Sequence, residues 1–171
     1  MRNERLKRLL YYTDPNALSL PKLTNEQTLS LLNNQIKLIP RLNAEDDAKP
    51  YIIISLDNFE PQPGQNNFKS AILSFDILSP FDYWMLGDFK LRPYAIAGEI
   101  DALINKATVG FGIANFIGGK QLFLGNDLGG ITLYYSVEAF NEDKQLHPEE
   151  KDYPMPRNAQ PPYRPNNLNG R

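Results

Sequence analysis

The segment from Trp84 to Asn105 constrains the fold most, because it joins a helix start signal to a single apolar stripe. Pro93 marks the start, since proline is tolerated in the first helical turn, where its missing N–H would have no partner. Large aliphatic side chains then recur at the helical period and form a stripe of Ile96, Ile100, Leu103 and Ile104. We expect this stripe to pack on a β-sheet. Glu99, Asp101 and Asn105 fall on the opposite side, where they are free to face a neighbour or a channel.

Two helices are expected before this segment. Residues 1–12 place leucines along one side and basic residues around the rest, which indicates a short amphipathic helix. Its charges are either solvated on a docking helix, which is the commoner case, or form a basic arm that touches an acidic partner or DNA. A capping box over residues 24–27 starts a second helix, which we place from Asn25 to Leu38 and end at Pro40.

The strands expected next differ in how they are buried. The β-branched run Tyr51 to Leu56 fits a strand buried on both faces near the centre of a sheet. The run from Phe68 to Leu78 alternates, and the face expected in the core carries Ala71, Leu73, Phe75 and Ile77. Between these runs, Asp57 to Asn67 holds two prolines, a glycine and several amides, so we predict a long surface loop.

Glycines shape the segment after the central helix. Short strands are expected from Thr108 to Ile117 and from Lys120 to Gly125, with a turn at 118–119. The sequence GNDLGG at 125–130 favours a tight hairpin, because glycine and asparagine adopt positive φ readily. Its second strand is expected over residues 131–137. These strands would close the sheet against the helix.

The sequence therefore predicts an α+β fold, with a small, mostly antiparallel β-sheet packed against a central helix. At 171 residues and 42% hydrophobic content, one core is expected. We divide the chain into an N-terminal helical part (1–40), an α+β core (41–140) and an extended Pro-rich C-terminal tail (141–171). The tail has too few aliphatic residues to form a core, and Tyr153 and Tyr163 are spaced to anchor it on a neighbouring subunit.

The composition argues against catalysis. The chain has no cysteine, which excludes disulfides and thiolate chemistry. The single histidine, His147, lies in the tail, so a histidine-centred base or metal site has no place in the core. A net charge of −2 gives no basic field for nucleic acid, and the apolar runs are too short to span a bilayer. We predict no catalytic residue, no metal site and no cofactor.

A rival hypothesis uses carboxylates. Asp57, Asp76 and Asp82 are sufficient in number for a metal or acid–base site. Scattered surface acids are commoner than such sites, so the hypothesis of a non-enzymatic protein is preferred.

Several residues are candidates for an interface. An aromatic cluster of Phe81, Tyr83, Trp84 and Phe89 precedes the central helix, and a tryptophan there usually packs while its N–H bonds a carbonyl. The Arg92 guanidinium either clamps a carboxylate across an interface or caps a neighbouring carbonyl. The full set of interface candidates is Phe59, Phe81, Trp84, Arg92, Glu99, Asp101, Tyr153 and Tyr163.

One further pattern is the sequence SFDILSPFDYWMLGDFKLRPYAIAGEIDALIN from Ser74, followed by a glycine-broken segment and then GGITLYYSVEAF, within a region of roughly residues 51 to 140. It resembles the strand, loop, helix and closing hairpin of tailed-bacteriophage neck proteins of the tail terminator or tail-completion (head–tail joining) type. The resemblance implies a structural virion protein, made in the host cytoplasm, whose subunits form a ring. Such rings are commonly hexameric, and a dodecamer is the alternative.

The resemblance also implies partners. A neck ring would cap the tail and join it to the head connector, so the expected partners are further copies of the chain and the neighbouring connector and tail proteins. No membrane contact is expected, and DNA passes through the ring only as cargo. The alternatives are a small carboxylate- or metal-dependent enzyme and a monomeric adaptor that binds one partner protein.

Overall fold

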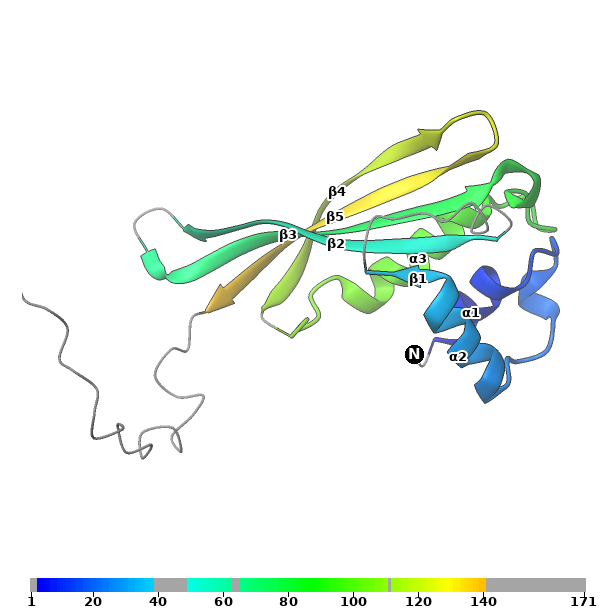
Figure 1. Cartoon of the computed structure of the whole chain (residues 1–171), viewed down its shortest axis with the longest axis horizontal. Helices are drawn as coiled ribbons and strands as arrows, with labels where there is room; N and C mark the ends of the chain where they lie inside the picture. The colour runs from blue at the N-terminus through cyan, green and yellow to red at the C-terminus, as the bar shows by residue number, and fades with distance from the viewer. Residues whose placement is uncertain (1–2, 39–48, 63–64, 111, 141–171) are drawn as a thin grey trace, which may run out of the picture. The chain divides into compact units, whose positions relative to one another are not determined.

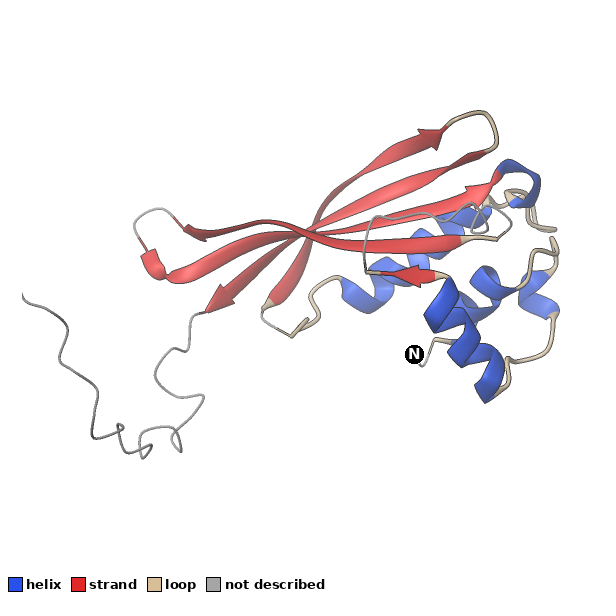
Figure 2. Cartoon of the chain, viewed as in Figure 1, coloured by secondary structure: helices blue, strands red, loops and turns tan. Residues whose placement is uncertain are grey.

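The computed structural model describes residues 3–38, 49–62, 65–110 and 112–140, which all belong to one compact unit, Met1–Asn141. Its elements in chain order are α1 (Glu4–Tyr11), η1 (Ala17–Ser19), α2 (Asn25–Asn34), β1 (Ile36–Lys37), β2 (Tyr51–Gln62), β3 (Gln65–Pro80), η3 (Phe81–Tyr83), α3 (Arg92–Ile104), β4 (Ile113–Leu124) and β5 (Leu128–Phe140). The predicted α+β class is confirmed, with three α-helices and a five-stranded, mostly antiparallel sheet in these ranges (Figures 1 and 2). The predicted tail lies outside the described residues.

The two N-terminal helices begin where the sequence indicates. The Asn3 side chain caps α1 by accepting a hydrogen bond from Leu6 N at 3.0 Å. The predicted capping box starts α2, since Thr24 Oγ1 accepts from Gln27 N at 3.2 Å and Gln27 Oε1 accepts from Thr24 N at 2.9 Å. Within the described ranges, no helix has the length and apolar character that a membrane crossing requires.

The end of α2 was predicted too late. The helix stops at Asn34 instead of Leu38, and Ile36 and Lys37 form the short strand β1, which pairs in parallel with β2. Tertiary pairing overrides the helical pattern here. The buried Gln35 amide fixes the junction, because its Nε2 donates to Leu10 O at 2.8 Å and to Pro50 O at 3.2 Å.

The central helix α3 begins at Arg92 with Pro93 in its first turn, as predicted. Ile96 and Ile100 are buried, but the prediction that Leu103 is buried is wrong, because its side chain is 45% exposed. On this side of α3 the cover comes from α1, which begins next to Glu99, and Leu103 lies one turn farther along. Ile104, farther along α3, still packs against the core, so only Leu103, on the flank of the stripe, is left uncovered.

The sheet has the strand order β1-β2-β3-β5-β4. The loop predicted from Asp57 to Asn67 is wrong, because β2 and β3 continue as an antiparallel hairpin to Gln62 and Gln65. A bulge between Asp57 and Glu60 absorbs the irregular sequence, and Asn58 within it adopts a φ of 51°. In Figure 1 this hairpin extends away from the α-helices as an arm.

The second hairpin joins β4 and β5. The predicted turn is confirmed, with Gly125 at a φ of +70°, which glycine adopts without strain. The expected turn at 118–119 is wrong, because those glycines lie within the single strand β4, next to a register shift between Phe116 and Gly118. Gly130 allows β5 to approach β3, since a Cβ there would lie 1.7 Å from Ile77 O.

The two faces of the sheet are buried differently. One face meets the α-helices, and the predicted core residues of β3 are confirmed there as Ala71, Leu73, Phe75 and Ile77. Leu9 and Leu10 of α1 belong to the same hydrophobic cluster, so the N-terminal helices and the sheet share a core. The other face holds a smaller buried cluster of Tyr51, Ile53, Leu78 and Leu128. The run from Tyr51 to Ile53 is thus buried on both faces, but Leu56 is exposed.

Candidate functional site

Arg92 is among the interface candidates, and its side chain is fully buried within one chain. Its guanidinium donates hydrogen bonds only to backbone carbonyl oxygens, and these belong to Tyr83 (2.7 Å), Leu9 (2.9 Å), Tyr12 (2.5 Å), Thr13 (3.1 Å) and Asp14 (2.6 Å). Burial lowers the pKa of Arg92 to about 10, against a smaller opposing effect of Asp14. Of the two roles left open by the sequence, the structure supports carbonyl capping.

Glu99 is also used within the chain. Its carboxylate accepts from Asn3 Nδ2 at 2.8 Å and from Arg5 Nε at 2.7 Å. Burial disfavours ionisation of this carboxyl, but the hydrogen bonds from Asn3 and Arg5 outweigh it and lower the pKa of Glu99. Glu99 therefore holds the start of α1 against α3 and is not free to face a neighbour, contrary to the prediction.

Asp101 and Asn105 bond to the sheet instead of facing outward. Asp101 Oδ1 accepts from the Tyr135 hydroxyl at 3.0 Å, and Asn105 Oδ1 accepts from Phe116 N at 3.2 Å. Burial, together with the negative Asp101, raises the pKa of Tyr135. The polar side chains of α3 thus hold the helix to the sheet.

The aromatic cluster predicted before α3 is present, but it does not contain the predicted set of residues. Phe81 packs on Trp84 with ring centroids 4.9 Å apart, and Trp84 stacks on Phe123 at 6.4 Å. Trp84 Nε1 donates to Ser79 O at 2.9 Å, as expected for a packed tryptophan. Phe89 is 90% exposed and makes no ring contact within the described residues, so its placement in the cluster is wrong.

Phe123 was missed by the sequence analysis. It lies opposite Gly129 in the β4–β5 register, and a Cβ at Gly129 would lie 2.9 Å from the Phe123 ring and 3.0 Å from the Phe81 ring. The glycine therefore makes room for both rings. The available signal was the LFLG run before the hairpin turn, which sets an aromatic residue opposite a glycine.

Exposed apolar side chains gather on β4. Large apolar side chains that remain exposed along this strand are Ile113, Phe116, Ile117, Phe123 and Leu124. They form two groups near the ends of the strand, and each group has side chains on both faces of the sheet. Exposed apolar side chains on an edge strand favour binding of another chain. Of the other predicted interface residues, Tyr153 and Tyr163 lie outside the described residues, as does the side chain of Phe59.

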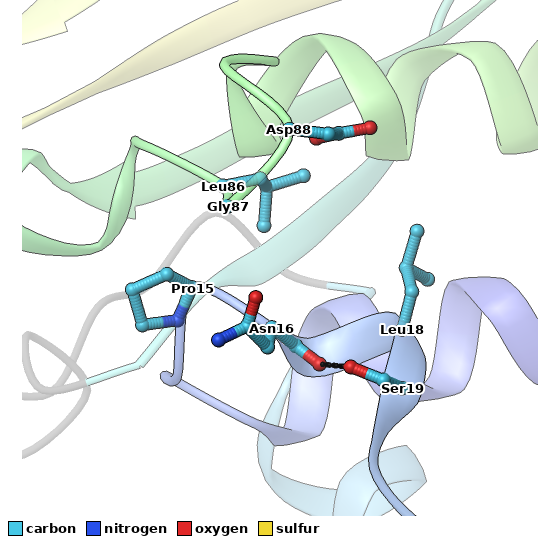
Figure 3. Close-up of a pocket in the computed structure, with 7 residues that line it drawn as sticks. All are labelled: Pro15, Asn16, Leu18, Ser19, Leu86, Gly87 and Asp88. Atoms are coloured by element: carbon cyan, nitrogen blue, oxygen red, sulfur yellow. Dashed lines mark hydrogen bonds between the residues drawn. The ribbon is translucent and has the colours of Figure 1, made fainter.

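A cavity of about 420 Å³ opens between the loop after α1 and the turn before α3 (Figure 3). It is lined by Pro15, Asn16, Leu18, Ser19, Leu86, Gly87 and Asp88. Gly87 N donates to Pro15 O at 2.9 Å, which joins the two sides of the cavity. Its one carboxylate, Asp88, binds Lys90 Nζ at 2.6 Å, so the cavity offers no pair of acids for acid–base chemistry.

The three acids of the rival hypothesis do not converge. Asp76 accepts from Thr132 Oγ1 at 2.6 Å, whereas Asp57 and Asp82 are exposed. Asp76 lies directly across from Ile53 of β2, and Asp57 is four residues farther along that strand. At the usual rise per residue, Asp57 is therefore about 13 Å from the position opposite Asp76. In the described part of the chain, no group of three or more His, Cys, Asp or Glu residues could hold a metal ion.

None of the curated proteins matches the chain. The family model YomW matches residues 3–137, which covers α1 through most of β5. The chain therefore belongs to the YomW family.

Proposed function

We propose that the chain is a structural virion protein of a tailed phage, which assembles into a ring in the neck, caps the tail and joins it to the head connector. The proposal rests on a contrast between the polar side chains of α3, which are bonded inside the chain, and the apolar side chains of β4, which are exposed. Arg92, Glu99 and Asp101 are bonded within the fold, whereas apolar side chains remain exposed along the edge strand β4. Such a surface suits association and not catalysis.

The contacts of α3 support the same reading. Arg92 ties this helix to the loop after α1, Glu99 ties it to the start of α1, and Asp101 ties it to β5. A ring subunit must keep its shape when neighbouring subunits bind to it. Side-chain hydrogen bonds between helices and strands meet that requirement. The phage setting comes from the resemblance of the strand, loop, helix and hairpin order to neck proteins.

The partners proposed are further copies of the chain, in a hexamer or a dodecamer, together with connector and tail proteins. DNA passes through the ring as cargo. Within the α+β core, the β2–β3 arm is suited to reach a neighbour, because it extends beyond the helices (Figure 1).

The experiment that tests this function is electron microscopy of two samples. The purified full chain should form rings in negative stain, and antibodies against the chain should label the neck of intact phage particles. A protein that is strictly monomeric and absent from particles would refute the proposal. If rings form but the neck is not labelled, the proposed self-assembly stands and the proposed location in the neck is refuted.

A further inference from the structure

The outer edge of β4 is open over most of its length. At its start the edge is occupied, because Ala114 N donates to Ala107 O at 3.0 Å and Phe116 N donates to Asn105 Oδ1 at 3.2 Å. From Ile117 to Leu124, no described residue pairs with the outer side of the strand. We name this stretch the β4 edge. Its outward N–H and C=O groups are available to another strand.

The β4 edge has few of the devices that usually block pairing, namely one lysine and the bulge beside Gly118. Ile117 and Phe123 are each 55% exposed, and Leu124 is 40% exposed. Lys120 is its single charged residue. Natural edge strands are protected by several charges, prolines or a covering element, so an apolar edge of this length indicates a partner.

The opposite side of the sheet presents a second open edge. The short strand β1 covers β2 only at Ile52 and Ile53, and no described residue pairs with the outer side of β2 beyond them. We name Ile54 to Gln62 the β2 edge. It carries two exposed acids, Asp57 and Glu60, and no base, so its charge is opposite to that of the β4 edge. Pro61, which has no N–H, and the bulge between Asp57 and Glu60 limit strand pairing to part of this edge.

The strand directions of the two edges are compatible. Each of the pairs β2–β3, β3–β5 and β5–β4 is antiparallel, so β4 runs opposite to β2. Within one copy, Lys120 is level with Ile53 across the sheet, through Thr132 and Asp76. A second copy that continues the sheet must therefore be displaced along the strands by four residues, about 13 Å, before its β2 edge meets the β4 edge in antiparallel orientation with Asp57 opposite Lys120. Because the displacement is an even number of residues, each face of the sheet stays on the same side in both copies.

We propose that the β4 edge of one copy pairs with the β2 edge of the next, a head-to-tail contact that leaves one open edge at each end until a ring closes. This assignment rests on the proposed self-assembling function and names its interface. The contact brings Lys120 to the strand that carries Asp57 and Glu60. Pairing of two β4 edges about a two-fold axis would instead bring two Lys120 side chains together, with no acid on β4 to offset them.

The test uses the absence of cysteine from the chain. A full-length variant with Lys120→Cys and Asp57→Cys is treated with a short bismaleimide and run on a denaturing gel. Within one copy the two strands are three strand spacings apart, about 14 Å, so a short linker joins only different copies. The expected result is a ladder of dimers, trimers and larger species. A matched control pairs Lys120→Cys with Lys22→Cys, which lies away from the β2 edge and should give no ladder.

The single variants separate the possible outcomes. Under the head-to-tail contact, neither Lys120→Cys nor Asp57→Cys alone should cross-link. Dimers from Lys120→Cys alone, with no ladder from the double variant, would overturn the proposal in favour of a two-fold contact. Rings in the microscope without any cross-link would overturn the proposed interface but leave the ring function standing, whereas a monomeric wild-type protein would overturn both.

Charge reversal gives an independent readout. Lys120→Glu alone should weaken assembly by roughly tenfold at low salt, because it places a third acid at the contact. Adding Asp57→Lys and Glu60→Lys should restore assembly. Unchanged melting temperatures of the unassembled variants control for folding. Failure of the combined variant to recover would contradict the proposed pairing.

Discussion

Arg92 offers the sharpest test of how this fold is held together. Replacing it by methionine keeps much of the side-chain volume but removes all five hydrogen bonds to carbonyl oxygens. The Leu9 carbonyl lies in the last turn of α1, where no intrahelical donor remains, and the guanidinium also places a positive charge at that helix end. Arg92→Met therefore uncaps α1 and releases the loop after it.

The expected loss is about 3–5 kcal/mol of the free energy of unfolding. A buried carbonyl left without a partner costs about 1–3 kcal/mol. The carbonyls of Thr13 and Asp14 lie toward the surface and regain water, so they contribute least. The loss is moderated further because the native guanidinium is itself desolvated, as its pKa of about 10 indicates.

The assay is urea unfolding of the full chain, followed by far-UV circular dichroism. Arg92→Lys should recover only part of the loss, because an ammonium has three donors and cannot reach five carbonyls. Lys90→Met, which removes an exposed cation, serves as the control and should change stability by less than about 0.5 kcal/mol. A loss below about 1 kcal/mol for Arg92→Met would refute the proposed role.

The remaining predictions concern α3 and its partners. Ile100→Ala should cost about 2–5 kcal/mol and Leu103→Ala less than about 1 kcal/mol, because only Ile100 is buried; equal losses in urea unfolding would contradict the described burial. The pKa of Glu99 is lowered on folding, so its contribution to stability is present above its unfolded pKa near 4.5 and is lost as the pH falls. Glu99→Gln should therefore flatten the acid side of a plot of melting temperature against pH. The pKa of Tyr135 is raised on folding, so its contribution is present below pH 10.0 and declines above it; Tyr135→Phe should flatten the alkaline limb, and an unchanged limb would count against the buried hydroxyl.

Local signals in the sequence predicted the elements that depend on local chemistry. The capping box of α2, the proline at the start of α3 and the GNDLGG turn each specify backbone geometry within a few residues. The alternation of β3 also gave the correct core face, because a strand with one face buried has a period of two.

The errors arose where distant segments decide the structure. The end of α2 depends on β1 pairing with β2, and the polar run after Asp57 became a strand because β3 pairs with it through a bulge. Glu99 looked free because its partner, Asn3, lies 96 residues away in the chain. No periodicity in the sequence carries that information.

The candidate surface was predicted only in part. The packing of Trp84 was expected from the sequence, but Trp84 and Phe81, both named as interface candidates, contact each other and Phe123, which a hairpin brings onto them. The β4 edge could not be identified from sequence, because whether a strand lies at the centre or the edge of a sheet depends on the strand order.

The most direct test of self-assembly is native mass spectrometry of the full chain over a range of concentrations. The account predicts a closed species at six or twelve times the 19.5 kDa mass of one chain. Its proportion should fall with Lys120→Glu and recover when the acids of the β2 edge are reversed. A single species at the mass of one chain, at every concentration measured, would contradict the central claim.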